Sequence, residues 1–368
     1  MKLDPFLTPR FHSEFRRDPL VIHDVGAAGG IYPLYRDTPA DLWRAYGFEP
    51  TPASFAKLRQ ISAGQTNVEL HELALTDHAG TADFHVYADV PTNSSLNRNT
   101  LVLEDGKAQC QVVTVTCERM DAFCAEPGRA TPDFIKLDTE GTELQVLLGG
   151  QDVIAASALA VVSEIKFVHL SPEATQFSDL DAFLRGKGFM LFDIQTSRQA
   201  RCVGQRFGGK KGAIDAAYVL YLRDFYSYYR SHLADKPELA RIKLLKLMSL
   251  AVRYLYLDYA VELADFGRSQ GLLNPDEARE LLRLYTGVTD RSWSLPNFPG
   301  KAKLALLVDY VSYMLQPEMK LAVPPMFNNF GNRRSALTRQ SPPSQIRLQH
   351  SVRALTDAGS VEVAIQIE

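Results

Sequence analysis

The feature that most constrains the fold is an alternation of short apolar runs with amphipathic stretches between Leu20 and about Arg223. A buried, β-prone run followed by a covering helix, repeated along the chain, is typical of a largely parallel sheet with helices on both faces. The sequence therefore predicts an α/β fold built on a Rossmann-like, doubly wound, mostly parallel sheet.

Individual segments of this alternation match strands or helices. The predicted strands are Leu20–Val25, Trp43–Glu49, Asn67–Leu73, Thr81–Tyr87, Gln111–Thr116, Pro132–Asp138, Ala158–Phe167, Phe189–Ile194 and Ala217–Leu222. The last two are expected to close the sheet as a hairpin-like pair. A helix is predicted over Pro52–Ile61, with Thr51 as its cap and Pro52 in its first turn, and another over Thr142–Leu148. A polar loop over residues 92–95 interrupts the alternation.

Beyond Arg223 the pattern changes to long helical stretches. The predicted helices are Tyr226–Leu233, Leu239–Phe266, Asp276–Tyr285 and, after a linker over Trp293–Gly300, Lys301–Leu315. The third begins at Asn274-Pro275-Asp276-Glu277, which is a helix N-terminus signal. The predicted organisation is an N-terminal segment (1–19), a Rossmann-like domain (20–223), a helical accessory region (224–316) and a tail (317–368).

The tail is basic over residues 319–356, which hold Lys320, Arg333, Arg334, Arg339, Arg347 and Arg353 and no acidic residue. Its Pro, Ser and Asn content favours a partly ordered, solvated segment. Peripheral contact with a lipid headgroup, a phosphorylated glycan or an acidic carrier is the alternative. Residues 361–368 alternate apolar and polar side chains, which predicts a strand that pairs with the main sheet or with a neighbouring subunit.

Composition excludes several classes of protein. The net charge of −3 offers no general attraction for nucleic acid. The N-terminus lacks the continuous apolar core of a signal peptide. The most apolar stretch, Leu239–Leu257, holds four basic residues, too many for a membrane span. Cys110, Cys117, Cys124 and Cys202 form no CxxC pair, so a reduced, cytoplasmic protein is expected.

The most informative motif spans residues 21–30, where an apolar strand ends in Asp24 and enters a turn of glycine and alanine only. The turn residues are Gly26, Ala27, Ala28, Gly29 and Gly30. With no bulky side chain in the way, a ligand can approach the backbone N–H groups at the carboxyl edge of the sheet. We therefore predict a ligand-binding turn here.

Two acids indicate which ligand this turn binds. The glycine spacing differs from the GxGxxG of a dinucleotide site, and Asp24 would repel a pyrophosphate but suits a sulfonium with its amino-acid tail. Glu49 ends the second predicted strand, where it can accept hydrogen bonds from both ribose hydroxyls. The pair favours S-adenosylmethionine over a nicotinamide cofactor, and a tight turn beside a surface acid is the alternative.

A second acidic cluster follows the strand at Pro132–Asp138. Asp138, Glu140 and Glu164 offer oxygen ligands for a divalent cation such as Mg²⁺, or groups that orient a hydroxyl nucleophile. Stabilisation of the N-terminus of the next helix is the alternative role, equal in weight for Glu140 and favoured for Glu143.

These motifs together resemble the FkbM family of methyltransferases, over roughly Leu20 to Ile194. The matching segments are Asp24-Val25-Gly26-Ala27-Ala28-Gly29-Gly30, Phe48-Glu49-Pro50, Ala74-Leu75, Ser94-Ser95-Leu96 and Ile135-Lys136-Leu137-Asp138-Thr139-Glu140-Gly141-Thr142-Glu143. The resemblance implies a class I methyltransferase fold and adds Pro50, Ala74, Leu75 and Asp138 to the predicted cofactor-binding residues. Ala28 departs from the family, which usually has Asn there.

The resemblance also implies in-line transfer of a methyl group to a hydroxyl, with a sugar or glycan as the leading acceptor. Polyketide, lipid and nitrogen acceptors, a non-catalytic scaffold and a nicotinamide dehydrogenase are the alternatives. A base must remove the hydroxyl proton, and His169 is the candidate, although packing is the commoner role of such a histidine. Lys166 and Lys136 are alternative catalytic groups, with a salt bridge to Asp138 or Glu164 favoured for Lys136.

Aromatic residues gather after the predicted sheet. They are Phe225, Tyr226, Tyr228, Tyr229, Tyr254, Tyr256 and Tyr259. Such residues can form the wall of a sugar-binding cleft, but at helical spacing core packing is favoured, including packing across a homodimer interface.

Overall fold

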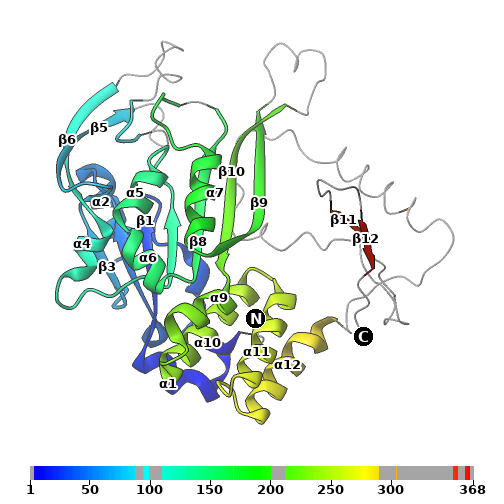
Figure 1. Cartoon of the computed structure of the whole chain (residues 1–368). Coiled ribbons are helices and arrows are strands. Elements are labelled where there is room, and N and C mark those ends of the chain that lie inside the picture. Colours follow the sequence, from blue (N-terminus) through cyan, green and yellow to red (C-terminus); the bar gives the residue numbers. More distant parts are fainter. Residues whose placement is uncertain are drawn as a thin grey trace. The chain divides into compact units, whose positions relative to one another are not determined.

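The computed structural model describes most of the N-terminal 289 residues and short parts of the rest. The described residues are 4–87, 94–98, 110–168, 170–199, 212–289, 304, 351–354 and 361–364. The chain divides into two units: Met1–Leu295 with Val323–Asn332, and Pro296–Ala322 with Arg333–Glu368. Figure 1 shows the elements of both.

A seven-stranded sheet forms the centre of the first unit, in the order β3-β2-β1-β7-β8-β10-β9. Its strands are β1 (Leu20–Val25), β2 (Trp43–Phe48), β3 (Val68–His71), β7 (Phe134–Leu137), β8 (Ala160–Lys166), β9 (Phe189–Gln199) and β10 (Ala213–Arg223). The first five strands in this order pair in parallel, whereas β10 is antiparallel to both of its neighbours. The predicted doubly wound sheet and its closing antiparallel pair are confirmed.

Beside β1 the chain order reverses, because β1 pairs with β2 on one side and with β7 on the other. Open α/β sheets bind their ligands at the carboxyl ends of the strands at such a point. The fold therefore directs attention to the residues that follow β1, β2, β7 and β8.

A smaller sheet has the order β4-β6-β5 and consists of β4 (Ala74–Leu75), β5 (Gly80–Tyr87) and β6 (Cys110–Glu118). It contains both of the extra strands expected around the polar loop. Of that loop, Ser94 and Ser95 are described, whereas Thr92 and Asn93 lie outside the described residues.

Helices α5 (Glu143–Gly149), α6 (Gln151–Ser157) and α7 (Phe177–Gly186) cover one face of the sheet (Figure 1). Two further helices are α2 (Pro52–Ile61) and α4 (Met120–Ala125). Thr51 precedes α2 as predicted, but its hydroxyl donates to Glu49 (2.7 Å) instead of accepting from a helix N–H. Thr51 therefore occupies the predicted N-cap position, but without a side-chain hydrogen bond to the helix, because its hydroxyl is directed to the Glu49 carboxylate.

Alternate residues of each strand face opposite sides of the sheet. On β8, Ala160 and Val162 pack in the core shared with the helical region, whereas Val161 and Ile165 pack in the core on the other face. Continuing the alternation, Glu164 occupies the Ala160 face at the carboxyl end of β8. This face therefore changes from apolar to polar along the strands.

The connection between β1 and β2 contains no α-helix. Residues 26–42 form only two single-turn 3₁₀ helices, η3 (Pro33–Tyr35) and η4 (Ala40–Leu42). Helices from the C-terminal part of the chain gather at one end of the sheet and pack against the core next to this connection (Figure 1).

The helical region consists of α9 (Phe225–Tyr228), a π-helical turn (Tyr229–Leu233), α10 (Pro237–Arg253), α11 (Leu257–Ser269) and α12 (Pro275–Thr289). The prediction of one helix over Leu239–Phe266 is wrong, because α10 ends at Arg253 and Leu255 adopts a left-handed conformation with φ of 65°. At α12 the predicted N-terminus signal is confirmed: the side-chain oxygen of Asn274 accepts from the N–H of Glu277 (2.9 Å), and the Glu277 carboxylate accepts from the N–H of Asn274 (2.9 Å).

The N-terminal segment packs onto this helical region. It forms two 3₁₀ turns, Pro5–Leu7 and Pro9–Phe11, followed by α1 (His12–Arg17). Phe6, Phe11 and Phe15 are each 0% exposed and belong to the same core as α10. The segment is thus part of the first unit.

In the second unit, β11 (Ser351–Ala354) and β12 (Val361–Ala364) form an antiparallel pair. The strand predicted near the C-terminus is present over 361–364, and its partner within the chain is β11, not the main sheet; pairing with a neighbouring subunit stays a prediction. The linker over 293–300, the helix over 301–315 except Leu304, and most of the basic tail lie outside the described residues. Within the described part of the chain, none of the helices combines the length and the apolar character that a membrane span needs.

Candidate active site

The glycine-rich turn after β1 is tightly built. Gly26 has φ of 78°, and a Cβ atom there would lie 2.0 Å from the carbonyl oxygen of Asp138, so only glycine fits. The N–H groups of Gly26 and Ala27 both donate to the carbonyl of Phe48 (3.0 Å each). Ala28 and Gly29 are exposed, so this part of the turn presents backbone that a ligand can reach.

Asp24 lies beneath this turn and is 0% exposed. Its carboxylate accepts from the N–H of Tyr32 (2.6 Å) and lies 3.1 Å from the Lys136 ammonium. Burial raises the pKa of Asp24, although Lys136 and the Tyr32 N–H act in the opposite direction. These contacts tie Asp24 to the residues around the turn, and its direct contact with a cofactor stays a prediction.

Lys136 on β7 joins the ends of β1 and β7. Its ammonium donates to the carbonyl of Gly26 (2.9 Å) and lies 3.6 Å from Asp138 as well as 3.1 Å from Asp24. Burial acts to lower its pKa, but Asp24 and Asp138 outweigh that effect and the pKa is raised, so the side chain stays charged. The predicted salt bridge to Asp138 is present, and a shorter one to Asp24 accompanies it.

Glu49 follows β2 at the same edge and is 5% exposed. Its Oε1 accepts from the N–H (3.1 Å) and the hydroxyl (2.7 Å) of Thr51. Burial raises its pKa, with Thr51 and Lys136 opposing. Among the described residues no donor is found for Oε2, which is therefore available for a ligand hydroxyl.

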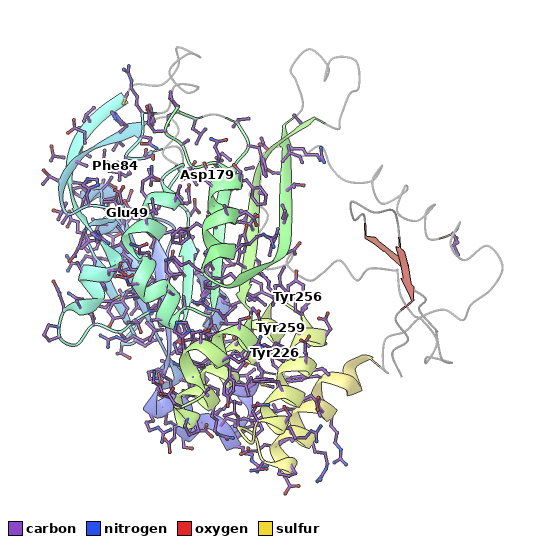
Figure 2. All side chains as sticks on the ribbon, viewed as in Figure 1. Glu49, Phe84, Asp179, Tyr226, Tyr256 and Tyr259 are labelled. Atoms are coloured by element: carbon purple, nitrogen blue, oxygen red, sulfur yellow. The ribbon has the colours of Figure 1, made fainter. Side chains whose placement is uncertain are left out.

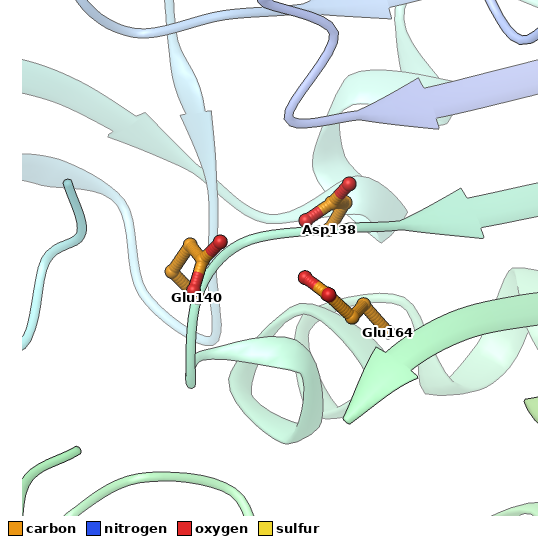
Figure 3. Close-up of side chains that lie close together, drawn as sticks. All are labelled: Asp138, Glu140 and Glu164. Carbon is orange, nitrogen blue, oxygen red and sulfur yellow. The ribbon is translucent and has the colours of Figure 1, made fainter. Parts of the chain in front are cut away.

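Asp138 and Glu140, which follow β7, come together with Glu164 near the carboxyl end of β8 (Figure 3). One carboxylate oxygen of each lies within 4.8 Å of the others. Glu140 stands in the left-handed region with φ of 56°. Strained backbone of this kind persists only where neighbouring groups hold it, and it is concentrated at functional sites.

Glu143 holds that strained loop. Its Oε1 accepts from the N–H (3.1 Å) and hydroxyl (3.0 Å) of Thr139 and from the N–H of Gly141 (3.1 Å). Ser95 and Asn97 support the loop from the other side, by donating to the carbonyls of Thr139 and Gly141. Glu143 therefore has a structural role, but the bonds of its carboxylate to Thr139 and Gly141 hold the loop before α5, whereas the sequence favours stabilisation of the N-terminus of that helix.

Lys166 on β8 is the only cation that an ion pair joins to Glu140 or Glu164 among the described residues, at 3.3 Å from Glu140 and 2.9 Å from Glu164. Burial raises the pKa of Glu140 to about 7, helped by Asp138 and Glu143 and opposed by Lys166. Burial and Asp138 also raise the pKa of Glu164 well above its ordinary value. One lysine cannot neutralise both acids, so protonation of one is favoured at neutral pH.

Tyr218 on β10 is a site residue that the sequence reasoning missed. It is the register partner of Glu164, so the two side chains share a face of the sheet. Burial and the nearby carboxylates of Asp138, Glu164 and Glu140 raise its pKa, which keeps the hydroxyl protonated as a hydrogen-bond donor. The sequence could have indicated this position, because Tyr218, Leu220 and Leu222 alternate along the predicted strand and must therefore share one face of the sheet.

Other predicted site residues divide into those outside the described part and those buried in protein. His169 lies outside the described residues. Ala74 and Leu75 are 7% and 2% exposed, and pair with β6 in the smaller sheet. Pro50 follows Glu49 and is half-buried. Their contact with a cofactor stays a prediction.

Core packing is confirmed for most of the aromatic cluster. Phe225, Tyr228, Tyr254 and Tyr259 are 0%, 3%, 2% and 5% exposed. Figure 2 shows Tyr226, Tyr256 and Tyr259 among the helices, away from Glu49. The hydroxyl of Tyr256 donates to the carbonyl of Phe192 (3.0 Å), so it packs against β9.

The sequence from Asp24 to Leu191, which carries all of these acids, matches the family described as the methyltransferase FkbM domain. The match covers residues 24–191, slightly less than half of the chain. The resemblance inferred from the motifs is therefore confirmed, and the FkbM domain includes the glycine-rich turn, the three-carboxylate cluster and all strands of the sheet except β10 and parts of β1 and β9.

Two curated relatives are similar to this chain. The 2-O-methyltransferase NoeI of Sinorhizobium fredii (strain NBRC 101917 / NGR234) is 24% identical over 149 residues, which cover 37% of this chain and 54% of the relative. The 31-O-demethyl-FK506 methyltransferase FkbM of Streptomyces tacrolimicus is 26% identical over 194 residues, which cover 46% of this chain and 73% of the relative. The match thus spans about half the length of the first relative.

Solved structures are similar at lower identity. Methyltransferase FkbM from Methylobacillus flagellatus KT has a TM-score of 0.31 at 15% identity, covering 59% of this chain and 52% of that one. Precorrin-6y C5,15-methyltransferase from Geobacter metallireducens GS-15 has a TM-score of 0.30 at 13% identity, covering 58% and 86%.

Proposed function

We propose that this protein is an S-adenosylmethionine-dependent O-methyltransferase that methylates a hydroxyl of a sugar, a glycan or a related metabolite. The observation that carries the proposal is that the FkbM domain, residues 24–191, contains the acids gathered at the carboxyl ends of β1, β2, β7 and β8. Both curated relatives are named for methylation at a numbered oxygen, which supports a hydroxyl acceptor.

The residues present fit this cofactor. The exposed backbone at Ala28 and Gly29 leaves room beside the turn, and no atom lies within 4 Å of the Cβ position of Gly29. Glu49 offers Oε2 to the ribose hydroxyls, while Asp24 and Lys136 hold the turn. When bound, S-adenosylmethionine supplies an electrophilic methyl group.

Glu140 is the proposed base. An alcohol is a poor nucleophile until its proton is removed, and a base works best when its pKa lies near the working pH. Burial raises the pKa of Glu140 to about 7, and the side chain projects from the loop beyond β7 into the acidic cluster. Glu140 would accept the hydroxyl proton as the new oxygen–carbon bond forms and the methyl–sulfur bond of the cofactor breaks, which leaves S-adenosylhomocysteine; Glu140 would then release the proton to water.

Lys166 and Tyr218 are proposed to assist the proton transfer to Glu140. Lys166 keeps the neighbouring carboxylates from repelling the negative charge that builds up on the acceptor oxygen. Tyr218 stays protonated, so its hydroxyl can donate a hydrogen bond to the acceptor oxygen or to a carboxylate of the cluster. His169 is the competing base, so a His169→Gln variant that keeps full activity supports Glu140.

A Mg²⁺ ion bound by Asp138, Glu140 and Glu164 is the competing explanation of the cluster. Lys166 already provides a positive charge 2.9 Å from Glu164 and 3.3 Å from Glu140, and a divalent cation there would repel it. We therefore propose proton transfer without a metal at this site. Loss of methyl transfer after chelation, restored by Mg²⁺, would favour the metal.

The proposal is tested with the full chain by isothermal titration with S-adenosylmethionine and, separately, with NADH. Methyl transfer from labelled cofactor is then measured on a panel of sugars, polyketides, lipids and amines. Binding of S-adenosylmethionine with transfer to a sugar hydroxyl is expected. Binding without transfer to any acceptor would indicate a scaffold, and binding of NADH alone a dehydrogenase. A cytoplasmic location, a homodimer and membrane contact through the tail stay predictions.

A further inference from the structure

The connection between β1 and β2 depends on another part of the chain for its conformation. Parallel strands are usually joined by a helix that makes its own backbone hydrogen bonds, but residues 26–42 contain only single 3₁₀ turns. Even so, Tyr32 and Tyr35 in this connection are 3% and 0% exposed. The groups that hold them must lie elsewhere, and they lie at the C-terminal end of α10.

Arg253, the last residue of α10, makes most of these contacts. Its guanidinium donates to the carbonyl of Leu34, to Asp37 (2.8 Å) and to the hydroxyl of Thr38 (2.5 Å). It also lies over the ring of Tyr35, 4.1 Å from the centroid. A planar guanidinium can satisfy several acceptors at once in this way, whereas a lysine ammonium cannot reproduce the same fork.

Two neighbours of Arg253 reinforce the attachment. The hydroxyl of Tyr254 donates to the hydroxyl of Tyr32 (3.2 Å) in a buried environment. Ser249, one turn earlier on α10, shares a hydrogen bond of 2.9 Å with the hydroxyl of Tyr35. The C-terminal end of α10 and the residue after it thus hydrogen-bond to both Tyr32 and Tyr35 of the connection.

The connection in turn reaches the cofactor side of the FkbM domain. The backbone N–H of Tyr32 donates to Asp24 (2.6 Å), which pairs with Lys136, and Lys136 donates to the carbonyl of Gly26. A continuous series of contacts therefore runs from Arg253 and Tyr254 to the glycine-rich turn. Coupling between separated groups requires such a physical connection, and a measured effect on binding establishes it.

We propose that the C-terminal end of α10 is part of the cofactor site, with Arg253 and Tyr254 as positioning residues that keep the glycine-rich turn in its binding conformation. The helical region then has a role in S-adenosylmethionine binding itself, in addition to any role in acceptor choice. This inference rests on the proposed function, because it assumes that S-adenosylmethionine is the ligand of that turn.

The test compares two arginines of the same helix in the full chain. Arg253 also pairs with the carboxylate of Asp4. Arg253→Lys keeps a cation beside Asp4 but removes the guanidinium hydrogen bonds to residues 34–38 of the connection. Arg241→Lys is the matched control, because Arg241 forms a similar fork to Glu14 and Glu277, away from the connection. Both variants are expected to lose thermal stability, whereas only Arg253→Lys weakens S-adenosylmethionine binding, by about tenfold in titration calorimetry.

Tyr254→Phe is the second variant, because it removes one hydroxyl and keeps the packed ring. It is expected to weaken binding about threefold, which matches the loss of one hydrogen bond. Equal affinity in wild type, Arg253→Lys and Tyr254→Phe would overturn the inference, as would an equal loss in Arg241→Lys. Failure of the wild type to bind S-adenosylmethionine would instead contradict the proposed function.

Discussion

The two ends of the central strands both bury charged side chains, but the balance of charge differs. At the amino ends, the carboxylate of Asp133 lies 2.6 Å from Lys243 and 2.8 Å from Lys246, and also accepts from the N–H of Val21 (2.9 Å). Lys246 has a second acidic partner in Asp18 (2.7 Å). Each charge of this cluster, Asp133, Lys243 and Lys246, has an opposite charge in contact.

At the carboxyl ends the acids outnumber the bases. Asp138, Glu140 and Glu164 lie together with Lys166 as their nearest partner, and Lys136 is divided between Asp24 and Asp138. The pKa values of the carboxylates at the two ends therefore shift in opposite directions. Burial raises the pKa of Glu140 to about 7, whereas at the other end Lys243 and Lys246 outweigh burial and hold the pKa of Asp133 below its ordinary value.

The difference separates a structural ion cluster from a functional one. A buried carboxylate that is fully paired resists protonation and links elements, here α10 with the strand ends. One that lacks a full partner can exchange a proton at neutral pH, as a general base must. Substitutions at the two ends should therefore affect different measurements.

The largest effect is expected at the carboxyl end. Glu140→Gln should lower kcat for methyl transfer by about 10²- to 10⁴-fold, because the amide cannot accept the hydroxyl proton. Binding of S-adenosylmethionine should remain. In the wild type the rate should rise with pH through about 7, because the base must be ionised and burial raises the pKa of Glu140 to about 7.

The exposed Glu126, whose side chain is 54% exposed, provides the matched control for this rate measurement. Glu126→Gln should keep both the rate and its dependence on pH. A wild-type rate that does not change between pH 6 and 8, or a Glu140→Gln variant of full activity, would assign the proton to another group.

The next effect concerns the amino end. Asp133→Asn should reduce the free energy of unfolding by about 3–5 kcal/mol, because it leaves two buried lysines without their shared carboxylate. A carboxyl with a lowered pKa stabilises the native state above its ordinary pKa, and that stabilisation is lost as pH falls through the lowered value. The variant should therefore show a weaker loss of stability toward acid pH than the wild type.

Urea unfolding at several pH values measures both quantities. Asp265→Asn is the control, because Asp265 is 61% exposed and pairs with Arg268 on the surface of α11, where such pairs contribute about 0.5 kcal/mol. If Asp133→Asn proved as mild as this control, the amino-end cluster would not be the structural counterpart described above.

Local signals in the sequence account for much of the fold. The Thr51-Pro52 pair marked the start of α2, and apolar runs ending in acids located β1, β2 and β7. Because parallel strands place their carboxyl ends at one edge, those acids could also be assigned to one site from the sequence. These predictions do not require knowing which residues of neighbouring strands are paired with each other.

Register and packing decide the rest. Asp24 meets Lys136 because they are direct partners in the pairing of β1 with β7, which no local pattern reveals across 111 intervening residues of chain. In the sequence, Lys243 and Lys246 indicate only that this stretch is too charged for a membrane span, yet in the structure both are buried against Asp133. Their role depends on where α10 docks.

The break between α10 and α11 shows a different limit. Helical periodicity continues through Tyr254-Leu255-Tyr256, and neither glycine nor proline interrupts it. The left-handed Leu255 is compensated by tertiary contacts, including the bond from Tyr254 to Tyr32. Local backbone bonds also close the helix end, with the N–H of Tyr256 donating to the carbonyl of Ala251 (2.8 Å).

A smaller effect should distinguish cofactor contact within the carboxyl end. Glu49→Gln should weaken S-adenosylmethionine binding about tenfold, because it replaces the charged Oε2 that the ribose hydroxyls would use. Titration calorimetry measures this, with the exposed Glu72 changed to Gln as control. Unchanged affinity in Glu49→Gln would place the ribose elsewhere.

The smallest effect is expected at Tyr218, where β10 supplies its own control. Tyr218→Phe should lower kcat about three- to tenfold, which corresponds to one hydrogen bond, and leave stability within about 0.5 kcal/mol. Tyr221, three residues along β10, faces the opposite side, and its hydroxyl donates to Asp181 (2.8 Å). Tyr221→Phe should therefore reduce stability and leave kcat unchanged. Equal rates in the two variants would exclude Tyr218 from the catalytic cluster and restrict that cluster to the ends of β7 and β8.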